Sequence, residues 1–349
     1  MKKIYLSVLF SACAGIVLNA QNVPLPDKEG SLVKWMSLQE ALDKTKVQQK
    51  PIILDFYTDW CGWCKKMMAS TYANPNLAAY INENFYAVKF NAEGKDTIEY
   101  LGQKYVPISD APRTTHPLAA KLLQNKLMYP TTLFLNSYDK QKNEFGFSML
   151  AQGYLEVKKI EPLLVFQLEN AYRNSQYEEF EKQYNKAFYD SAAYEKFKLI
   201  NWMKPADFFG KQDSSSKKTL VFIHTEWCNS CRVMHRTSFT DELTEKYLKE
   251  KYNWVDFNPE LTEPLSFHGQ TFTNPRSPQI PFHQLAIALC RNNFSLPTVA
   301  ILDEKLNLLD AVPLYLNPKV LKDITTYYGD NIYKAKSWQD YIKPANTAK

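Results

Sequence analysis

Residues 54–65 read LDFYTDWCGWCK, and the rest of the architecture can be worked out from this stretch. The run Ile52–Tyr57 is mostly apolar and indicates a buried strand. Residues 61–69 contain no proline and only one glycine, so they suit a helix whose first turn carries both Cys61 and Cys64. Residues three apart share a helix face, which brings two cysteines within the ~4.4 to 6.8 Å Cα separation that a disulfide needs. The stretch therefore predicts a strand that leads directly into a helix with a dithiol at its N-terminus.

The neighbouring segments extend this pattern to an α/β fold. Ser37 can cap a helix over residues 38–49, and a β-α-β order follows from the apolar runs on either side of the dithiol. The order ends with a β-hairpin and a helix, which indicates a layered α/β sheet. The other expected elements are a strand over residues 86–90, a helix over 117–125, a strand over 131–136 entered through Pro130, and a hairpin tip at 138–144.

The second half of the chain repeats the first. Residues 32–136 align with residues 199–303 without a gap, and 26 of the 105 positions are identical. Such a fixed offset indicates one structural unit made twice. We expect two tandem domains, at residues 21–180 and 199–349, joined by a charged helical linker at residues 181–198. The identical positions pair Trp60, Cys61, Cys64 and Pro130 with Trp227, Cys228, Cys231 and Pro297.

The N-terminus has the pattern of a secretory signal peptide over residues 1–20. A basic start at Lys2 and Lys3 precedes an apolar stretch and a small residue, Ala20, after which we expect cleavage. The alternative is a lipoprotein site with Cys13 acylated. No later segment approaches the ~20 consecutive apolar residues that span a bilayer. The sequence thus predicts a soluble periplasmic or secreted protein, in a compartment that permits disulfides.

Composition excludes several other classes of protein. Apolar residues make up 45% of the 349 residues and charged residues 23%, which is ordinary for a globular protein and not for a disordered or multi-span membrane protein. The formal net charge is only +5. Nothing in this balance requires an acidic polymer as a partner, so we expect no nucleic-acid binding.

Five cysteines follow the signal region: two pairs with two intervening residues, and the single Cys290. Haem attachment would need His after each second cysteine, but Lys65 and Arg232 stand there. A shared zinc site is disfavoured because each pair lies in its own repeat. Redox-active dithiols without metal or cofactor are therefore favoured over inert bridges, since so short a loop removes little chain entropy. Cys290 aligns with Leu123 and is expected to be a buried, inert core residue.

Together with Tyr129-Pro130-Thr131, residues 54–65 resemble the active-site segment and the cis-proline loop of the thioredoxin superfamily. The spacing from the first cysteine to the proline is the same in both repeats, from Cys61 to Pro130 and from Cys228 to Pro297. The chain after the signal region resembles secreted bacterial tandem thioredoxin-like proteins. This resemblance implies two thioredoxin-like domains, each a central mixed sheet flanked by helices.

The resemblance also implies roles for individual residues. Cys61 corresponds to the attacking cysteine and Cys64 to the resolving one. Asp55 matches the buried acid that takes the proton of the resolving thiol, and a strand-end acid in solvent is the alternative. A cis Pro130 would hold the backbone of Tyr129 open to an extended substrate strand. The further residues expected to contact substrate are Trp60, Trp63, Trp227, Leu296 and Pro297.

The second repeat departs from the superfamily pattern. Phe222 stands at the position of Asp55, so proton transfer to Cys231 would need another group. The residues between Cys228 and Cys231 are Asn229-Ser230 rather than a glycine and a tryptophan. The pair Cys228–Cys231 is either a differently poised redox centre or a bridge that seldom turns over.

Each repeat carries an insert of about 20 polar and proline-rich residues before the helix that precedes the cis-proline strand. The inserts span residues 94–115 and 261–282, and each is followed by a histidine, His116 or His283. A long loop in a compact domain is often functional, so the insert is either a lid beside the dithiol or a surface embellishment. The histidines either act near the thiolate or cap the following helix.

Two classes of function fit these observations. The favoured one is an extracytoplasmic thiol-disulfide oxidoreductase that acts on protein cysteines, with the first domain the more active and reduction the preferred direction. Its partners would be cysteine-containing extracytoplasmic proteins, and a membrane thiol reductase would supply electrons. The alternative is a client-binding, chaperone-like protein whose disulfides are mainly structural, because the fold alone does not decide function.

Overall fold

The computed structural model describes residues 27–211 and 214–343. The chain divides into two compact units, with the boundary between Leu168 and Glu169. We refer to the described residues up to Leu168 as the first unit and to those from Glu169 as the second unit. The predicted signal peptide, and the alternative acylation of Cys13, lie outside the described residues.

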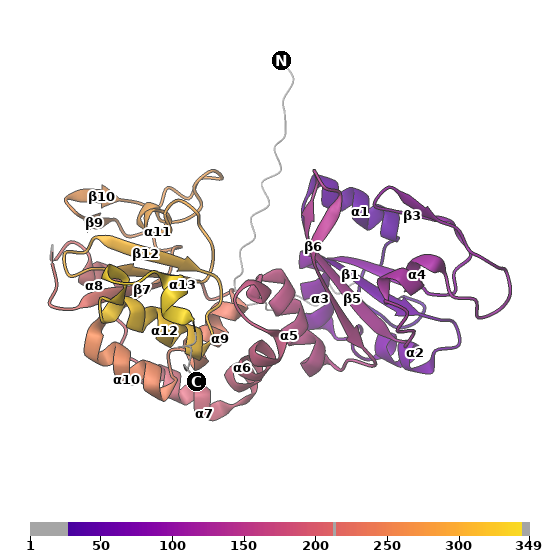
Figure 1. The fold of residues 1–349 in the computed structure, drawn as a ribbon, viewed down its shortest axis with the longest axis horizontal. Coiled ribbons are helices and arrows are strands. Elements are labelled where there is room, and N and C mark those ends of the chain that lie inside the picture. Colours follow the sequence, from indigo (N-terminus) through magenta and orange to yellow (C-terminus); the bar gives the residue numbers. More distant parts are fainter. Residues whose placement is uncertain (1–26, 212–213, 344–349) are drawn as a thin grey trace, which may run out of the picture. The chain divides into compact units, whose positions relative to one another are not determined.

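The first unit is built around a mixed four-stranded sheet. The strand order is β2-β1-β5-β6, with β1 parallel to β2 and antiparallel to β5, and Figure 1 shows β1, β5 and β6 running side by side. The α/β class is thereby confirmed. The elements are α1 (Leu38–Val47), β1 (Ile52–Tyr57), α2 (Gly62–Ala69), α3 (Pro75–Asn84), β2 (Tyr86–Asn91), β3 (Ile98–Tyr100), β4 (Gln103–Tyr105), α4 (Pro117–Leu122), β5 (Thr131–Asp139), β6 (Glu144–Gln152) and α5 (Val157–Leu168).

Local chemistry explains where these elements begin and end. The Ser37 hydroxyl accepts a hydrogen bond from the backbone N–H of Glu40 and so caps α1. Helix α4 ends at Leu122, earlier than expected, because Gln124 and Asn125 adopt left-handed φ angles of 52° and 60°. Strand β5 runs on to Asp139, so the hairpin tip is shorter than the sequence predicts.

The second unit repeats this arrangement. Its sheet has the order β8-β7-β11-β12, and Thr219 pairs with Asn253 as Ile52 pairs with Tyr86 at the equivalent positions of the first unit. The elements are η2 (Ala171–Arg173), α6 (Tyr177–Tyr189), α7 (Ser191–Lys198), α8 (Pro205–Phe208), β7 (Lys218–Ile223), α9 (Asn229–Thr237), α10 (Glu242–Lys251), β8 (Tyr252–Phe257), β9 (Leu265–Phe267), β10 (Gln270–Phe272), α11 (Gln284–Leu289), β11 (Thr298–Leu302), β12 (Leu308–Pro313), α12 (Pro318–Gly329), η3 (Ile332–Lys334) and α13 (Trp338–Ile342).

The segment that the sequence suggests as a linker, residues 181–198, is helical but packs on the second unit. Helices α6 and α7 both contact α9, the helix that carries the second dithiol. Phe180, Tyr184 and Ala187 of α6 are buried. These apolar side chains lie at i, i+4 and i+7, so they form an apolar face of α6 that is stable only when it packs against another element.

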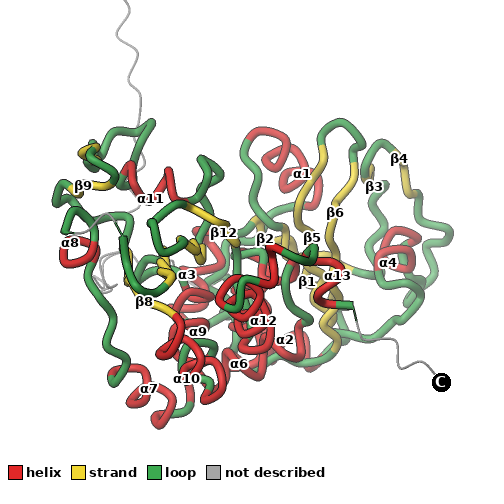
Figure 2. Tube along the Cα trace, turned by 60° about the vertical axis from the view of Figure 1, so that its left-hand side comes forward, coloured by secondary structure: helices red, strands yellow, loops and turns green. Residues whose placement is uncertain are grey.

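The inserts form short antiparallel hairpins, β3 with β4 and β9 with β10, and loop makes up most of the rest of each insert (Figure 2). His116 caps α4: its Nδ1 accepts from the N–H of Leu118, and its Nε2 lies 3.0 Å from the carbonyl oxygen of Asp96. His283 makes the same contacts at the equivalent position of the second unit. Both histidines therefore cap the following helix and connect it to an insert. Of the two roles that the sequence leaves open for them, these contacts correspond to capping.

The two cores are built from equivalent apolar positions. Burying a side chain of this size contributes roughly 1.5–3 kcal/mol, so these positions account for much of the stability of each unit. Among the described helices, none is long and apolar enough to cross a bilayer. The core residues include Leu54, Phe56, Val88, Leu118 and Leu133 in the first unit, and Val221, Ile223, Val255, Leu285 and Ala300 in the second.

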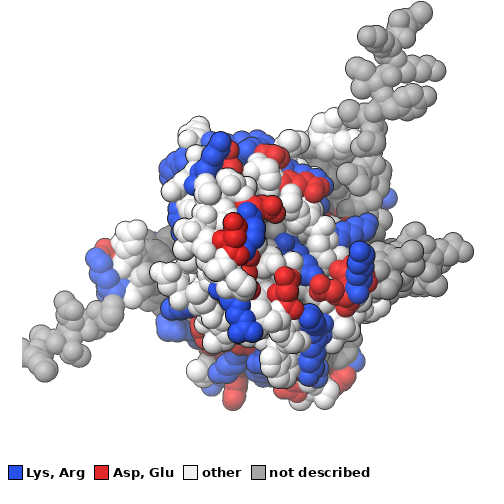
Figure 3. Space-filling model, turned by 90° about the vertical axis from the view of Figure 1, so that its right-hand side faces the viewer, with Lys and Arg blue, Asp and Glu red and all other residues white. Residues whose placement is uncertain are grey.

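Charge is distributed evenly on the face that Figure 3 draws. Lys and Arg side chains are interspersed with Asp and Glu side chains there. The described residues on that face thus form no continuous field of one sign.

Candidate active site

The first dithiol is a closed disulfide at the start of α2. The S–S bond of Cys61–Cys64 is 2.06 Å long and the Cα atoms are 5.3 Å apart. Cys61 is the N-cap residue, and its Sγ accepts a hydrogen bond of 3.1 Å from the backbone N–H of Cys64. Unpaired N–H groups and the helix dipole at this position stabilise a thiolate.

Asp55 lies in the interior of β1 and is fully buried. The Tyr72 hydroxyl donates a hydrogen bond of 3.2 Å to its carboxylate, and its partner in the register of β1 and β2 is Lys89. Burial raises the pKa of Asp55 to about 7, against the opposing effects of the Tyr72 hydrogen bond and the Lys89 charge. A carboxyl group with this pKa can accept and return a proton near neutral pH.

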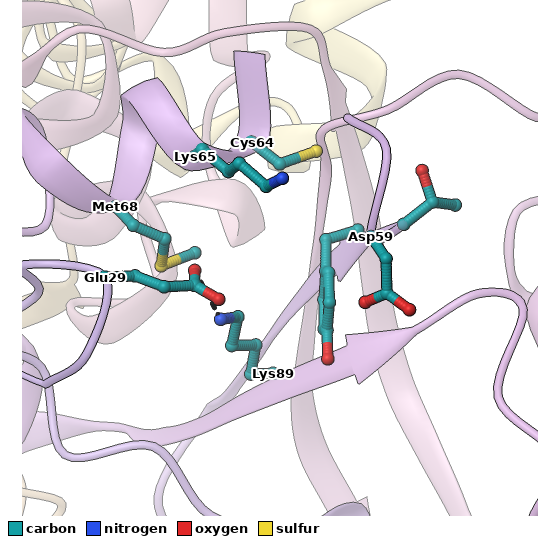
Figure 4. Close-up of a pocket in the computed structure, with 8 residues that line it drawn as sticks. Glu29, Asp59, Cys64, Lys65, Met68 and Lys89 are labelled. Atoms are coloured by element: carbon teal, nitrogen blue, oxygen red, sulfur yellow. Dashed lines mark ion pairs between the residues drawn. The ribbon is translucent and has the colours of Figure 1, made fainter. Parts of the chain in front are cut away.

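A small pocket, with a volume of about 230 Å³, lies beside the second cysteine of this pair. Figure 4 shows Cys64 of α2 and Lys89 of β2 facing it from opposite sides, with the Lys89 ammonium held 2.6 Å from the carboxylate of Glu29. The other lining residues of the pocket are Tyr57, Thr58, Asp59, Lys65 and Met68.

Aromatic side chains surround the first dithiol at the surface. Trp60 and Trp63 are 54% and 57% exposed, which is unusual for residues of this size. The Trp60 ring packs edge-on against Tyr129, with ring centroids 6.2 Å apart, and Trp63 packs against Tyr154 at 5.6 Å. The peptide bond between Tyr129 and Pro130 is cis. Sequence reasoning did not assign Tyr154, although it aligns with a tyrosine in the second repeat.

The second dithiol has the same local geometry. The S–S bond of Cys228–Cys231 is 2.01 Å long, and the Cα atoms are 5.2 Å apart. Cys228 is the N-cap residue of α9 and accepts from the N–H of Cys231. Trp227, which is 42% exposed, donates to Glu260 at 3.1 Å. The second cis bond joins Leu296 and Pro297.

A carboxylate occupies the N-terminus of α9, and no pattern in the sequence indicates it. Glu169 accepts hydrogen bonds from the backbone N–H groups of Asn229 (2.9 Å) and Ser230 (2.6 Å), and it lies 3.6 Å from Cys228 Sγ. Burial raises the pKa of Glu169, and the two N–H donors and the charge of Arg232 act against this. Glu169 precedes Cys228 by 59 residues, so spacing along the chain could not reveal the contact.

Around Phe222, the second unit places a cluster of titratable side chains. The Phe222 ring stacks on His224 with centroids 4.7 Å apart and contacts His235 at 5.3 Å. His224 is hydrogen-bonded through Nε2 to the carboxylate of Asp256. One ring nitrogen from each of His224 and His235 and one carboxylate oxygen of Asp256 all lie within 4.8 Å of one another. Sequence reasoning missed these three residues.

Cys290 is the one free cysteine among the described residues. Its side chain is 4% exposed and packs in the core of the second unit. Burial raises the pKa of the Cys290 thiol. A buried thiol with a raised pKa is a poor nucleophile, in agreement with the inert role expected for it.

Comparisons with known proteins match parts of the chain. Residues 19–162 match the family described as Thioredox_DsbH, "Protein of unknown function, DUF255". An uncharacterized protein of Caenorhabditis elegans, B0495.5, is 26% identical over 138 residues, which are 36% of this chain and 19% of that protein. The thiol:disulfide interchange protein DsbD of Vibrio vulnificus is 41% identical over 46 residues, 13% of this chain and 8% of that protein.

The chain thus spans less than a fifth of the length of these curated relatives. Among solved structures, a thioredoxin from Thermus thermophilus covers 38% of this chain with 84% of its own length, at 14% identity and a TM-score of 0.27. The family match covers the first dithiol, and the structure repeats the same strand order and helix-capping cysteine pair in the second unit. Residues 19–162 are thus similar to the family described as Thioredox_DsbH, and the second unit repeats the architecture of the first.

Proposed function

We propose that this protein is a thiol-disulfide oxidoreductase, and that the first unit carries most of its activity. The main support is the combination at one site of a helix-capping cysteine pair and a fully buried carboxyl group, Asp55, whose pKa lies near 7. The cysteine pair supplies the nucleophile and the electrons, and the carboxyl group supplies a proton acceptor.

The proposed reaction begins with the reduced pair. The Cys61 thiolate attacks a substrate disulfide, forms a mixed disulfide and displaces one substrate thiolate. Asp55 takes the proton of the Cys64 thiol. The Cys64 thiolate then attacks Cys61 Sγ, and the bond between Cys61 and the substrate breaks. Two electrons have passed from the dithiol to the substrate disulfide, and the protein is left with the Cys61–Cys64 bridge.

The exposed aromatic surface around this pair is the proposed substrate contact. Trp60, Trp63 and Tyr129 present apolar area beside Cys61, and an extended substrate segment would lie along Tyr129 and Pro130. In the second unit, Trp227, Leu296 and Pro297 occupy the equivalent positions.

We further propose that the substrates are cysteine-containing proteins outside the cytoplasm, and that a membrane thiol reductase supplies the electrons. The N-terminal pattern of the sequence supports the location. The similarity of a short segment to a thiol:disulfide interchange protein supports the chemistry.

A structural role for the second bridge is the competing proposal. Cys228 and Cys231 are 2% and 0% exposed, and Glu169 occupies the helix terminus that would otherwise stabilise a thiolate. Burial does not separate the two pairs, since Cys61 and Cys64 are 4% and 3% exposed, so the carboxylate at the start of α9 is the feature that favours this alternative for the second pair.

The deciding experiment measures the reduction potential of each pair in glutathione and dithiothreitol buffers. It uses the full chain and two variants, Cys61→Ser/Cys64→Ser and Cys228→Ser/Cys231→Ser, each of which retains one pair. A value for the first pair near about −270 mV supports a reductase, and one of roughly −180 to −120 mV supports an oxidase or isomerase. Reduction only on unfolding would favour the client-binding alternative.

A trapping experiment tests the mechanism directly. Cys64→Ser removes the resolving thiol, so mixed disulfides through Cys61 should accumulate with protein substrates. The matched control, Cys61→Ser, should accumulate none through this pair.

A further inference from the structure

Position 222 is a phenylalanine, so the second unit lacks the carboxyl group that Asp55 supplies in the first. We propose that His224, His235 and Asp256 together form the proton-accepting group for Cys231. This inference rests on the proposed function, because it assigns a step of thiol-disulfide exchange to the second unit.

The internal repeat places the three residues beside the second cysteine. In the first unit, Tyr57, Met68 and Lys89 line the pocket that Cys64 faces (Figure 4). The residues at the equivalent positions of the second repeat are His224, His235 and Asp256, and Cys231 is the equivalent of Cys64. The strand register agrees, because Phe222 pairs with Asp256 on β8 as Asp55 pairs with Lys89 on β2. The second unit therefore has two imidazoles and a carboxylate at these three positions. The first unit has a phenol, a thioether and an amine there.

The three side chains follow one another from α9 toward the surface, in the order His235, His224 and Asp256. His235 follows Cys231 by four residues on α9, so the two side chains share one helix face. The rings of His235 and His224 have centroids 4.8 Å apart, and His224 is hydrogen-bonded to Asp256. The side chain of His224 is 7% exposed, and that of Asp256 is 34% exposed. A proton taken near Cys231 can pass through the cluster to a carboxylate that touches solvent.

The charges of the cluster suit this task. The titratable groups that act on His235 are His224 at the end of β7, Arg236 on α9 and Asp256 on β8. Burial and the neighbouring His224 lower the pKa of His235 to about 3, so its imidazole is neutral. The hydrogen bond from His224 lowers the pKa of Asp256 and keeps it a carboxylate, although burial acts the other way. The hydrogen-bonded pair of His224 and Asp256 therefore includes a carboxylate that can take up a further proton.

Cys228 is first joined to a substrate sulfur as a mixed disulfide. The Cys231 S–H gives its proton to the cluster, where the hydrogen-bonded pair of His224 and Asp256 holds it. The Cys231 thiolate attacks Cys228 Sγ, and the bond between Cys228 and the substrate sulfur breaks. The substrate leaves as a thiolate and takes up a proton, and two electrons have passed from the dithiol to the substrate disulfide.

The test isolates the second pair in the full chain by the changes Cys61→Ser, Cys64→Ser and Cys290→Ala. The reduced protein is mixed with one equivalent of 5,5′-dithiobis(2-nitrobenzoate). The first release of thionitrobenzoate reports attack by Cys228, and the second reports resolution by Cys231. Both rates are measured over a range of pH for this background and for His224→Tyr, His235→Met and Asp256→Asn. Tyr and Met are the residues of the first unit at these positions, so they suit the fold.

We expect the second release to slow about tenfold or more at neutral pH in the variants, with the first release unchanged. The rates should converge with that of the background at high pH, where hydroxide removes the thiol proton without help. A defect in folding would slow the reaction at every pH. The matched reference is Asp55→Asn in the background that retains only the first pair.

Unchanged second-release rates in His224→Tyr and Asp256→Asn would overturn the inference. A second-release rate that falls when a chelator is added would also overturn it, because a bound metal would then carry the step. If the second pair gives no first release while the first pair reacts, the inference fails and the proposed function of the first unit stands. If neither pair reacts, the proposed function itself fails.

Discussion

At the scale of single residues, Asp55 has a cost in stability that follows from its pKa. Burial raises the pKa of Asp55 to about 7, from 3.8 in an unfolded chain. The folded state therefore binds the proton more tightly, and the free energy of unfolding falls as pH rises from about 4 to about 7. A shift of this size corresponds to about 4 kcal/mol, with all of the loss present above pH 7.

The first prediction concerns Asp55→Asn in the oxidised protein. Since the amide has no charge to bury, we expect the variant to be more stable than the original by about 2–4 kcal/mol at pH 8 and nearly equal to it at pH 4. Urea unfolding at the two pH values measures this. Resolution of mixed disulfides by Cys64 should slow in the same variant. A difference in stability that does not depend on pH would show that Asp55 is ionised in the folded protein at both pH values.

Glu169 gives the second prediction. Its carboxylate lies 3.6 Å from Cys228 Sγ and accepts from two N–H groups of α9, so it opposes a second negative charge on that sulfur. Glu169→Gln keeps the shape of the side chain and removes the charge. We expect the reduced Cys228 to be alkylated by iodoacetamide about tenfold faster at pH 7, because the neighbouring negative charge no longer opposes its thiolate.

The control for this prediction is the alkylation of Cys61 in the same molecule, which should not change. Equal alkylation rates of Cys228 in the variant and the original would mean that Glu169 carries a proton in the reduced protein.

At the scale of elements, the sequence predicts what is local. The strand Ile52–Tyr57 and the dithiol helix appear where expected, because apolar runs and the spacing of the cysteines carry the information. Helix α4 is shorter than predicted because Gln124 and Asn125 adopt left-handed φ angles. The sequence around them does not indicate this conformation. Helix α6 packs on α9 through an apolar face. The many charged residues of α6 make this face hard to recognise in the sequence.

The candidate site divides in the same way. The cysteines and Asp55 follow from local pattern and from resemblance. Glu169 reaches its cysteine only through the tertiary fold. Asp256 lies on β8 and His224 directly follows β7, and comparison of the two repeats at these positions was the one signal that could have found them.

The third prediction belongs to helix α4. His116 caps this helix through Nδ1 and contacts the insert through Nε2 at the carbonyl oxygen of Asp96. Loss of a cap costs about 0.5–2 kcal/mol, so His116→Ala should lower the free energy of unfolding by about 1–2 kcal/mol. His116→Asn restores a cap but does not reach the insert. Urea unfolding with limited proteolysis separates the two roles: both variants should expose residues 94–115 to cleavage, and only His116→Ala should lose the full stability.

The pKa of His116 sets the pH range of this effect. Burial lowers its pKa below the ordinary 6.5, so the folded state favours the neutral ring. The stabilisation is therefore present above about pH 6.5 and is lost as pH falls through the folded-state pKa. A stability gap between His116→Ala and the original that widens toward acid pH would contradict this assignment.

At the scale of the whole molecule, the two units share one architecture but differ in the charged side chains around their cysteine pairs. The equivalent core positions are apolar in both units, and the cysteine pairs are almost superimposable in their internal geometry. The differences lie in the charged groups near the sulfurs. In the first unit, Lys89 lines the pocket beside the second cysteine, and Asp55 is the partner of Lys89 in the strand register; in the second unit, Glu169 lies beside the first cysteine. Changes of this kind alter a dithiol without altering its scaffold.

The last prediction follows from that difference. A dithiol is a strong oxidant when its reduced form is stabilised, and the thiolate of Cys228 is destabilised by the neighbouring carboxylate. The second pair should therefore have the more negative reduction potential. A tenfold difference in equilibrium constant corresponds to about 30 mV, and we expect at least that separation. Glu169→Gln should reduce it, because the carboxylate is its source.

Equilibration of the oxidised full chain with graded ratios of reduced and oxidised dithiothreitol, followed by alkylation and peptide mass spectrometry, reads both pairs in one sample. Cys61 and Cys64 should become alkylated at a less reducing ratio than Cys228 and Cys231. Electrons would then pass from the second pair to the first when both meet a common thiol carrier, so the first pair would be the one that delivers them to substrates. If the second pair is reduced first, the helix terminus of α9 stabilises its thiolate in spite of Glu169, and the order of the two units in electron transfer is reversed.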